Sequence, residues 1–220
     1  MTTRLLEPLR LAFIGMSGAG KTFWTKKLAQ MGRPAIGCDD RIEERLRTHL
    51  AGEGYSGIGG VAAWMGWPSS AAYAEREARY LAAEIVVLGE ILGELEAHRQ
   101  RELVLDTTGS VIYAGNHLLL RLRKLMTVVH LAASPEEEKL LIERYLTEPK
   151  PVLWRGAFQP RPGEAPRDAV ARCYPALIAS RRRSYEALAH CTIPIAALRD
   201  SSLDADGILA LIQAQLERSR

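Results

Sequence analysis

The chain has 220 residues, of which 47% are apolar, and a formal net charge of +3. This length fits one α/β domain with insertions and disfavours two full domains, and the apolar content is enough for a sizeable core. The nearly balanced charge excludes a general polyanion-binding character. We therefore treat residues 1–220 as a single domain.

Short apolar runs alternate with helical patterns along the chain. The first run, residues 9–14, predicts a buried strand, and residues 22–31 predict a helix. Further strands are expected at residues 34–38, 102–106, 127–131 and 192–195. Further helices are expected at residues 39–50, 61–67, 71–98 and 118–126, from Ser134 onward, and at 168–190 and 202–218. This alternation indicates a three-layer α/β/α fold with a five-stranded parallel sheet.

Polar residues precede several of these helices and predict their N-caps. We expect Asp39-Asp40 and Ser69-Ser70 to cap the helices that follow them. Ser134 is expected to cap the next one, because Pro135 then occupies the first helical position and acidic residues follow in the first turn.

Residues 15–22 join the first strand to the first helix and read Gly-Met-Ser-Gly-Ala-Gly-Lys-Thr. This is a complete G-x-x-x-x-G-K-[ST] P-loop, a motif whose backbone N–H groups surround phosphate oxygens. A chance glycine-rich turn is the alternative, but the strand and helix on either side favour the motif. Lys21 is expected to reach the β- and γ-phosphates and Thr22 to hold Mg²⁺. The sequence therefore predicts that ATP with Mg²⁺ binds to Gly15, Ser17, Gly18, Ala19, Gly20, Lys21 and Thr22.

Two acidic residues lie at the ends of predicted strands. Ligands of parallel sheets bind outside the carboxyl ends of the strands, so we expect Asp39 and Asp106 near the P-loop. Asp39 is placed to take the proton of an acceptor hydroxyl, to cap a helix, or to do both. Asp106 is placed to hold Mg²⁺, as the second acid of P-loop enzymes does, and a cap or turn role is the equal alternative. Thr108 and Gly109 are expected to line the acceptor pocket, although small polar residues also form ordinary turns.

The segment 147–172 is expected to form a lid. From residue 144 to residue 183 the sequence has nine Arg or Lys against three Asp or Glu, and five of the eleven prolines fall between residues 149 and 166. This composition predicts a basic, loop-rich excursion that can close over ATP and exclude water. The candidates to reach the transferred phosphate are Arg155, Arg161 and Arg167, and a solvated surface position is the alternative for each.

The opening of the chain resembles that of shikimate kinases, in the nucleoside monophosphate kinase-like group. The P-loop, the short strand into Asp39 and Ile42-Glu43 carry the resemblance, and the P-loop is its most specific part. Weaker matches join residues 73–77 to the family's F-R-x-x-E segment, 103–111 to its glycine-triplet strand end, 150–153 to its lid R-P-L-L and 181–185 to its R-x-P-x-Y turn. The resemblance implies a P-loop kinase with a lid insertion. It further implies that Asp39 binds the acceptor hydroxyl, Arg181 grips a substrate carboxylate, and Arg144 and Lys150 lie near adenine and phosphates.

The chain departs from the family pattern on the acceptor side. Gly37 stands where the family has the first acid of its D-x-D, which implies that Asp106 supports Mg²⁺ instead. Ala74 stands where the family has a second carboxylate-binding arginine, and Arg76 is the candidate substitute. Thr107-Thr108 replace two of three glycines and add hydroxyl donors to the pocket wall. We therefore expect an intact phosphoryl-transfer half and a remodelled acceptor site, with shikimate used poorly or not at all.

The leading interpretation is an ATP-dependent kinase for a small hydroxylated metabolite. Residues 50–70 are expected to cover the acceptor site, where Trp64, Trp67 and Tyr73 are candidates to stack on a ring-bearing acceptor, although such residues are more often core. One alternative is a nucleoside or polynucleotide 5′-hydroxyl kinase, which the balanced charge disfavours. The other is a nucleotide-binding regulatory module without catalysis.

The remaining features point to a cytoplasmic protein that is a monomer or a homodimer. The three cysteines have neither metal spacing nor an even-numbered disulfide pattern. The N-terminal residues lack the apolar core of a signal peptide. No run approaches the roughly 18 apolar residues of a membrane span, so no membrane partner is expected.

Overall fold

The computed structural model describes residues 8–148 and 150–218. The strands are β1 (Arg10–Ile14), β2 (Ala35–Gly37), β3 (Leu103–Asp106), β4 (Thr127–Ala132) and β5 (Cys191–Pro194). The helices are α1 (Lys21–Gln30), α2 (Cys38–Gly52), α3 (Gly57–Met65), α4 (Tyr73–Ala97), α5 (Asn116–Leu125), α6 (Pro135–Thr147), α7 (Pro166–Leu188) and α8 (Ala205–Arg218). Short 3-10 helices occupy Val111–Tyr113 and Ile195–Leu198. Each strand and helix expected from the sequence is present, with ends shifted by a few residues.

The strands form one parallel sheet in the order β2-β3-β1-β4-β5, which confirms the predicted five-stranded sheet. The central strand β1 pairs with β3 on one side and with β4 on the other. Asp106 is level with Phe13 of β1 and with Gly37 of β2. This register brings the P-loop, the start of α2 and the residues after β3 to the same edge of the sheet.

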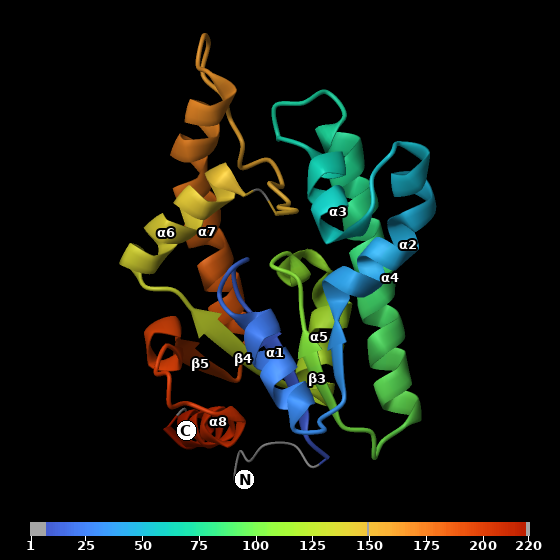
Figure 1. Cartoon of the computed structure of the whole chain (residues 1–220), viewed down its shortest axis with the longest axis vertical. Helices are drawn as coiled ribbons and strands as arrows, with labels where there is room; N and C mark the ends of the chain where they lie inside the picture. Colours follow the sequence, from blue (N-terminus) through green and yellow to red (C-terminus); the bar gives the residue numbers. More distant parts are fainter. Residues whose placement is uncertain (1–7, 149, 219–220) are drawn as a thin grey trace.

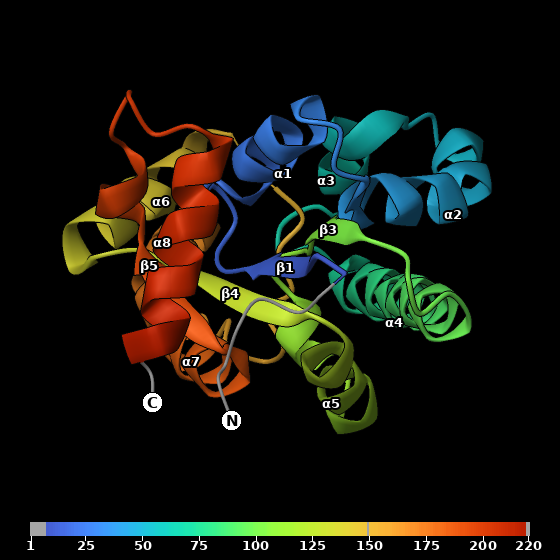
Figure 2. The same cartoon turned by 90° about the horizontal axis from the view of Figure 1, so that it is seen from below.

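Helices cover both faces of the sheet, as expected for strands that are buried throughout. In Figures 1 and 2, α1 and α8 lie on one face and α4, α5 and α7 on the other. Successive side chains of β1 alternate between the two apolar cores: Leu11 and Phe13 pack with α1 and α8, whereas Ala12 and Ile14 pack with α4, α5 and α7. This alternation is the period of two that a strand imposes on its side chains.

Three helix starts test the predicted N-caps. The prediction is confirmed at α6, where Ser134 Oγ accepts a hydrogen bond from the amide of Glu137 and the Glu137 carboxylate accepts one from the amide of Ser134. It is wrong at α4, whose N-cap is Ala72, because Ser70 Oγ instead donates to the carbonyl of Trp67. It is also wrong at α2, whose N-cap is Gly37, so that Asp39 and Asp40 occupy the first helical turn, where carboxylates favour the helix dipole.

Two groups of helices rise above the carboxyl edge of the sheet. Figure 1 shows α2, α3 and the start of α4 on one side and α6 and α7 on the other, with the segment 150–165 between them. We call residues 150–165 the lid segment, because they have no regular structure and connect α6 to α7. The predicted lid ran to residue 172, but α7 already begins at Pro166, and Pro149 lies outside the described residues. In the described part of the chain, the helices all lack the length or the apolar character required to traverse a lipid bilayer.

Candidate functional site

The P-loop follows β1 directly and takes a conformation that depends on its glycines. Gly15 has φ 140° and Gly18 has φ 83°, values that side-chain-bearing residues rarely adopt. A Cβ on Gly15 would lie 2.7 Å from the carbonyl oxygen of Leu131, and one on Gly18 would lie 2.9 Å from Leu141. Fixed backbone therefore excludes a larger residue at Gly15, whereas at Gly18 the Leu141 side chain would have to shift. The loop lies at the N-terminus of α1, the position that favours an anion.

Lys21 and Thr22 begin α1 and point into the same region. The buried Lys21 ammonium donates hydrogen bonds to the carbonyls of Gly15 at 3.0 Å and Met16 at 3.1 Å. Burial lowers the pKa of Lys21, while nearby Asp106 and Asp39 raise it. Thr22 Oγ1 donates a 2.5 Å hydrogen bond to Oδ2 of Asp106, which ends β3. The predicted metal-ligating pair is therefore in direct contact.

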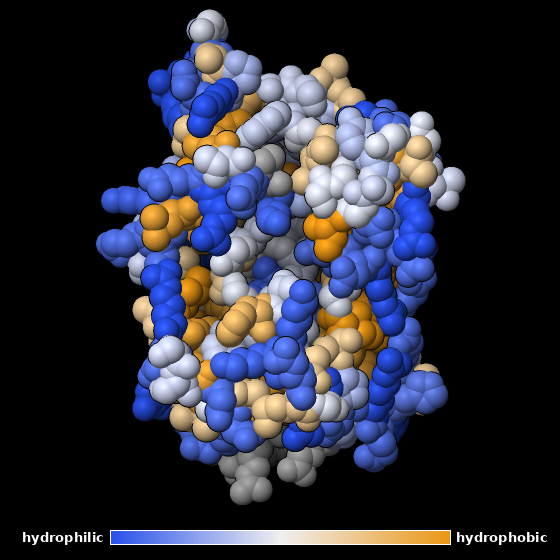
Figure 3. Space-filling model, in the orientation of Figure 1, coloured by the Kyte–Doolittle hydropathy of each residue, from blue (hydrophilic) through white to orange (hydrophobic). Residues whose placement is uncertain are grey.

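A cavity of about 410 Å³ opens at this edge of the sheet, and Figure 3 shows a hollow at the centre of the same face. The predicted site residues that line it are Ser17, Gly18, Gly20, Lys21, Thr22, Asp39, Asp106, Thr108, Gly109 and Lys150. Ile58 and Pro151, from the predicted cover segment and lid, also line it, as does Tyr80, which the sequence analysis missed. Residues from the P-loop, α2, β3 and the lid segment thus meet in one space.

A second cavity, of about 210 Å³, lies beside the first and shares Ser17, Gly18 and Lys150 with it. Arg144 of α6 lines this cavity, and its place near adenine and phosphates stays a prediction. The other lining residues were not predicted and come from α6, its C-terminal end and α7: Leu141, Tyr145, Glu148 and Tyr174. The P-loop therefore faces two connected spaces, one toward Asp39 and one toward α6 and α7.

Asp39 is half-buried in the first turn of α2. Its Oδ1 accepts a 3.0 Å hydrogen bond from the phenol of Tyr80. Burial raises the pKa of Asp39, while the charge of Lys21 and the hydrogen bond from Tyr80 lower it. Asp106 has the same balance: burial raises the pKa of its carboxyl, and Lys21 and the Thr22 hydrogen bond lower it. For both acids burial is the larger effect, so the pKa is raised, and Lys21 is the main group that opposes this rise.

The residues after β3 that line the cavity are held in place by Glu84 of α4, which the sequence analysis missed. Glu84 is buried and accepts hydrogen bonds from the hydroxyls of Thr108 and Ser110. Burial raises the pKa of Glu84 to about 7. Thr107 donates a 2.7 Å hydrogen bond to the carbonyl of Phe13. Both threonine hydroxyls therefore bind the protein itself, which corrects the expectation that they add donors to the pocket.

Arg181 lies between the lid segment and the residues after β3. It is 2% exposed, and its terminal nitrogens donate to the carbonyls of Gly109 at 3.2 Å and Leu153 at 2.5 Å. Its guanidinium also lies 5.4 Å from the ring centre of Tyr113. Arg181 is not among the residues that line either cavity, so this conformation does not offer it to a substrate carboxylate.

Arg76, the predicted substitute for a second carboxylate-binding arginine, is placed away from the cavity. Its terminal nitrogens bind the carbonyl of Trp64 and the carboxylate of Glu53, each at 2.5 Å. The residues of α4 that do reach the site are Tyr80 and Glu84. Tyr80 and Glu84 have the same spacing as Tyr73 and Glu77 but lie two helical turns later. The sequence analysis therefore chose a segment, residues 73–77, that lies two turns too early on the same helix.

Of the three aromatic residues near the cover segment, two are core residues and Trp67 is half-buried against the core. Trp64 is buried and donates a hydrogen bond to Glu53, and Tyr73 is buried against the lid segment. Trp67 packs edge-on against Tyr145 of α6. The alternative that the sequence analysis favoured for these residues therefore agrees with the structure.

The lid arginines do not reach the cavities in this conformation. Arg155 lies over the ring of Tyr113 at 5.9 Å, and Arg167 lines a separate pocket beside Trp67. Arg161 is exposed near the tip of the lid segment. None of them is among the described residues that line the P-loop cavities.

The donor set at the P-loop fits Mg²⁺ better than a transition metal. Among residues 8–148 and 150–218, no group of three His, Cys, Asp or Glu side chains is arranged to hold a metal ion. The paired oxygens of Thr22 and Asp106 suit a hard cation that takes few protein ligands and completes its shell with phosphate and water.

The chain has the fold of shikimate kinases. The shikimate kinase of Acinetobacter baumannii in complex with shikimate is 24% identical with a TM-score of 0.55, and the match covers 95% of this chain and 92% of that one. The shikimate kinase of Bacteroides thetaiotaomicron is 20% identical with a TM-score of 0.57, covering 94% and 98%. That of Aquifex aeolicus is 17% identical with a TM-score of 0.54, covering 96% and 97%. A scan against protein-family models and a search of curated proteins found no match. At these identities the likeness shows the fold, a five-stranded α/β fold of the P-loop kinase type.

Proposed function

We propose that this protein is an ATP-dependent kinase that transfers the γ-phosphoryl group to a hydroxyl of a small metabolite. The observation that carries the proposal is the meeting of Lys21, the Thr22–Asp106 pair and Asp39 in one cavity next to the P-loop. These are the groups that phosphoryl transfer needs: a cation for the phosphates, oxygens for Mg²⁺ and an acceptor for the hydroxyl proton.

In the donor half, the P-loop amides and Lys21 would bind the phosphates. The Lys21 ammonium already lies at the mouth of the loop, where its two carbonyl partners can be exchanged for phosphate oxygens. Thr22 and Asp106 would hold Mg²⁺, which neutralises charge on the phosphates when bound. The second cavity, with Arg144 and Tyr174, is the adjacent space for the nucleoside.

In the acceptor half, Asp39 would take the proton from the acceptor hydroxyl. The acceptor oxygen then forms its bond to the γ-phosphorus while the bond from that phosphorus to the bridging oxygen breaks, and ADP leaves. A half-buried carboxylate whose pKa is raised by burial, and whose charged form Lys21 and Tyr80 favour, suits the role of a base. Lys150 and Pro151 of the lid segment border the same cavity and would keep water from the phosphate.

The acceptor site supports a substrate other than shikimate. The terminal nitrogens of Arg181 donate hydrogen bonds to backbone carbonyls, and Arg76 is paired with Glu53. Neither arginine is therefore available for the planar two-point contact that a carboxylate favours. The neighbouring Acinetobacter protein was solved with shikimate, and that substrate does not transfer to this chain on fold likeness alone.

Several basic residues of this half of the molecule are already paired with acids and give no specific support to a polynucleotide acceptor. Arg172 pairs with Glu164 of the lid segment at 2.6 Å, while at the start of α6 Arg199 pairs with Glu137 at 2.8 Å and Arg182 with Glu138. Cations that are already paired contribute less to binding of a phosphate backbone. We also propose a cytoplasmic location, because Cys38, Cys173 and Cys191 are all free and buried thiols.

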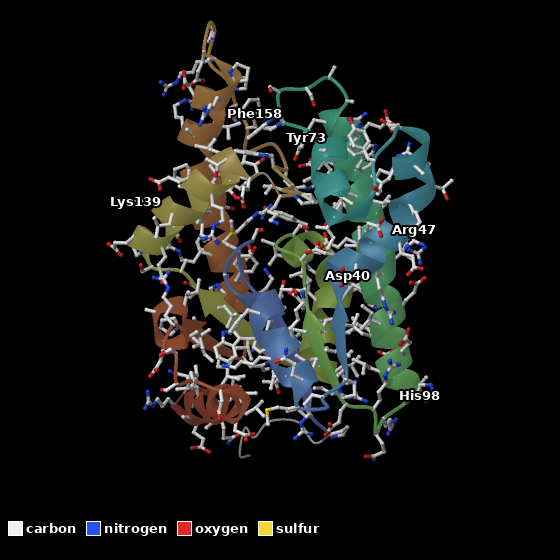
Figure 4. The ribbon with its side chains drawn as sticks, viewed as in Figure 1. Asp40, Arg47, Tyr73, His98, Lys139 and Phe158 are labelled. Atoms are coloured by element: carbon white, nitrogen blue, oxygen red, sulfur yellow. The ribbon has the colours of Figure 1, made fainter. Side chains whose placement is uncertain are left out.

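The test is acceptor-dependent release of ADP across a panel of shikimate, polyols, sugars, nucleosides and a 5′-hydroxyl oligonucleotide. Asp39→Asn should lower turnover by roughly 10²- to 10⁴-fold and leave ATP affinity nearly unchanged. Asp40→Asn is the matched control: it is the next residue of the same helical turn, labelled in Figure 4, but its carboxylate folds back over Gly37 and does not line the cavity.

Two results would contradict the proposal. Parental turnover in Asp39→Asn would remove the assignment of the base. Intact ATP binding with no acceptor-dependent ADP across the whole panel would favour the regulatory-module alternative instead.

A further inference from the structure

Helix α4 reaches the site at two points that are one helical turn apart. Tyr80 is 2% exposed, and its phenol donates to Oδ1 of Asp39 at 3.0 Å. Glu84, four residues later, accepts from the hydroxyls of Thr108 and Ser110 on the opposite wall. Residues four apart lie on the same face of a helix. Helix α4 therefore fixes the position of Asp39 on one side of the cavity relative to Thr108 and Ser110 on the other.

The hydrogen bond between Tyr80 and Asp39 has a fixed direction. Burial and the neighbouring Asp39 charge raise the pKa of Tyr80 well above its usual value, so the phenol stays protonated. An ionised carboxylate can only accept hydrogen bonds. Tyr80 is therefore a permanent donor to Oδ1, and within residues 8–148 and 150–218 no hydrogen bond to Oδ2 of Asp39 is formed.

We infer that Tyr80 is a positioning residue for Asp39: its hydrogen bond fixes the carboxylate through Oδ1 and leaves Oδ2 to take the proton of the acceptor. The role of Oδ2 rests on the proposed kinase function, whereas the contact itself is independent of it. The tyrosine ring packs in the core under α2, so the phenol cannot follow the carboxylate if Asp39 rotates away. A carboxylate held in one orientation loses little entropy when the acceptor arrives.

The charge state of Asp39 reflects groups from every element around it. These are Lys21 of α1, Cys38 and Asp40 of its own helix, Tyr80 and Glu84 of α4, Asp106 of β3 and Lys150 of the lid segment. Tyr80→Phe changes a single hydrogen bond in this set without changing any charge.

The first test measures the carboxylate directly, in the full-length protein without nucleotide or Mg²⁺. The ¹³C signal of the Asp39 carboxyl is assigned from its loss in Asp39→Asn and is then followed against pH. Tyr80→Phe should raise the pKa of Asp39, because a hydrogen bond to the charged form is removed. Tyr55→Phe is the control, a half-buried tyrosine that packs against the same core but lines neither of the two P-loop cavities.

Thermal melting of both variants checks that each is folded. An Asp39 pKa that is the same in the parent and in folded Tyr80→Phe would overturn the proposal, as would an equal rise in Tyr55→Phe. A rise in Tyr80→Phe alone supports the contact even if no acceptor is phosphorylated, in which case the kinase assignment fails by itself.

The second test uses the acceptor identified by ADP release. Tyr80→Phe should lower kcat by roughly ten- to a hundredfold, with little change in the KM for ATP, and should move the acid limb of the kcat/KM profile to higher pH. An unchanged kcat together with an unchanged acid limb would show that Tyr80 does not position the base.

Discussion

Tyr73 of α4 is bound to Val152 of the lid segment: its phenolic oxygen lies 2.6 Å from the carbonyl oxygen of Val152. The same oxygen accepts a 3.1 Å hydrogen bond from the amide of Trp154, and Glu77 accepts one of 2.9 Å from the amide of Arg155. Figure 4 shows Tyr73 beside this segment. Four consecutive lid residues, from Val152 to Arg155, thus bind α4 or α7, since Arg181 holds the carbonyl of Leu153. These four contacts hold the lid segment against α4 and α7.

Tyr73→Phe should loosen the contacts between α4 and the lid segment. The variant removes the donor to Val152 and the acceptor for Trp154, and a net hydrogen bond contributes about 1 kcal/mol. Amide exchange at Trp154 and Arg155 should therefore speed up by about tenfold, measured by hydrogen exchange with NMR or mass spectrometry. Tyr80→Phe is the control, because the phenol of Tyr80 contacts Asp39 and not the lid segment. Equal acceleration of exchange in both variants would show that the Tyr73 hydroxyl does not hold the lid segment.

Asp106→Asn should weaken the binding of Mg²⁺. Asparagine keeps the shape of the side chain and can still meet Thr22, but it removes the charge that a hard cation prefers. The Mg²⁺ concentration needed for half-maximal ADP release should rise by about tenfold, while binding of ATP without metal changes little. Asp40→Asn serves as the control, and an unchanged Mg²⁺ requirement in Asp106→Asn would place the metal elsewhere.

Glu84 should make the protein less stable as the pH rises toward 8. Its pKa is raised to about 7 in the fold, above the usual 4.5, so its contribution is fully present below pH 4.5 and is lost as the pH rises through 7. The loss corresponds to about 3 kcal/mol between these limits. Burial also raises the pKa of Asp39 and Asp106, so both acids should likewise lower the free energy of unfolding as the pH rises. Urea denaturation at pH 5 and pH 8 measures the difference.

Glu84→Gln should flatten this dependence, because the amide does not titrate. The variant should therefore be closer in stability at the two pH values than the parent. A parent and a variant that lose the same free energy of unfolding between pH 5 and pH 8 would rule out Glu84 as the titrating group.

Gly15→Ala should weaken nucleotide binding, whereas Gly32→Ala should preserve it. Both glycines have positive φ, so each substitution strains the backbone by about 1–2 kcal/mol. Only at Gly15 would the new Cβ also collide with backbone, 2.7 Å from the carbonyl of Leu131, whereas nothing lies within 4 Å at Gly32. Calorimetry with ATP should show at least a tenfold loss for Gly15→Ala, and a loss of equal size in Gly32→Ala would point to general strain rather than loop geometry.

Local patterns were sufficient for most of the fold. Each strand and helix follows from apolar runs and helical periodicity, and the P-loop follows from its own eight-residue motif because its geometry is set by neighbouring residues. Asp39 and Asp106 were found for a related reason: the carboxyl ends of parallel strands share one edge, so a residue that ends a strand is also placed in space.

The acceptor half could not be read in this way. Tyr73 with Glu77 and Tyr80 with Glu84 have the same spacing on one long helix, and the sequence does not say which turn faces Asp39. Arg76 and Arg181 carry the charge expected of carboxylate-binding residues, but Glu53 and the carbonyls of Gly109 and Leu153 occupy them. Their roles depend on partners that are distant along the chain.

The sequence by itself determined the class of fold and the position of the P-loop, because hydrophobic periodicity and the P-loop motif act over a few consecutive residues. Only the tertiary structure decided which side chains surround Asp39 and which of them are free to bind a ligand. That choice is made by packing of α4 and the lid segment against the sheet edge, where burial forces each polar group to find a partner.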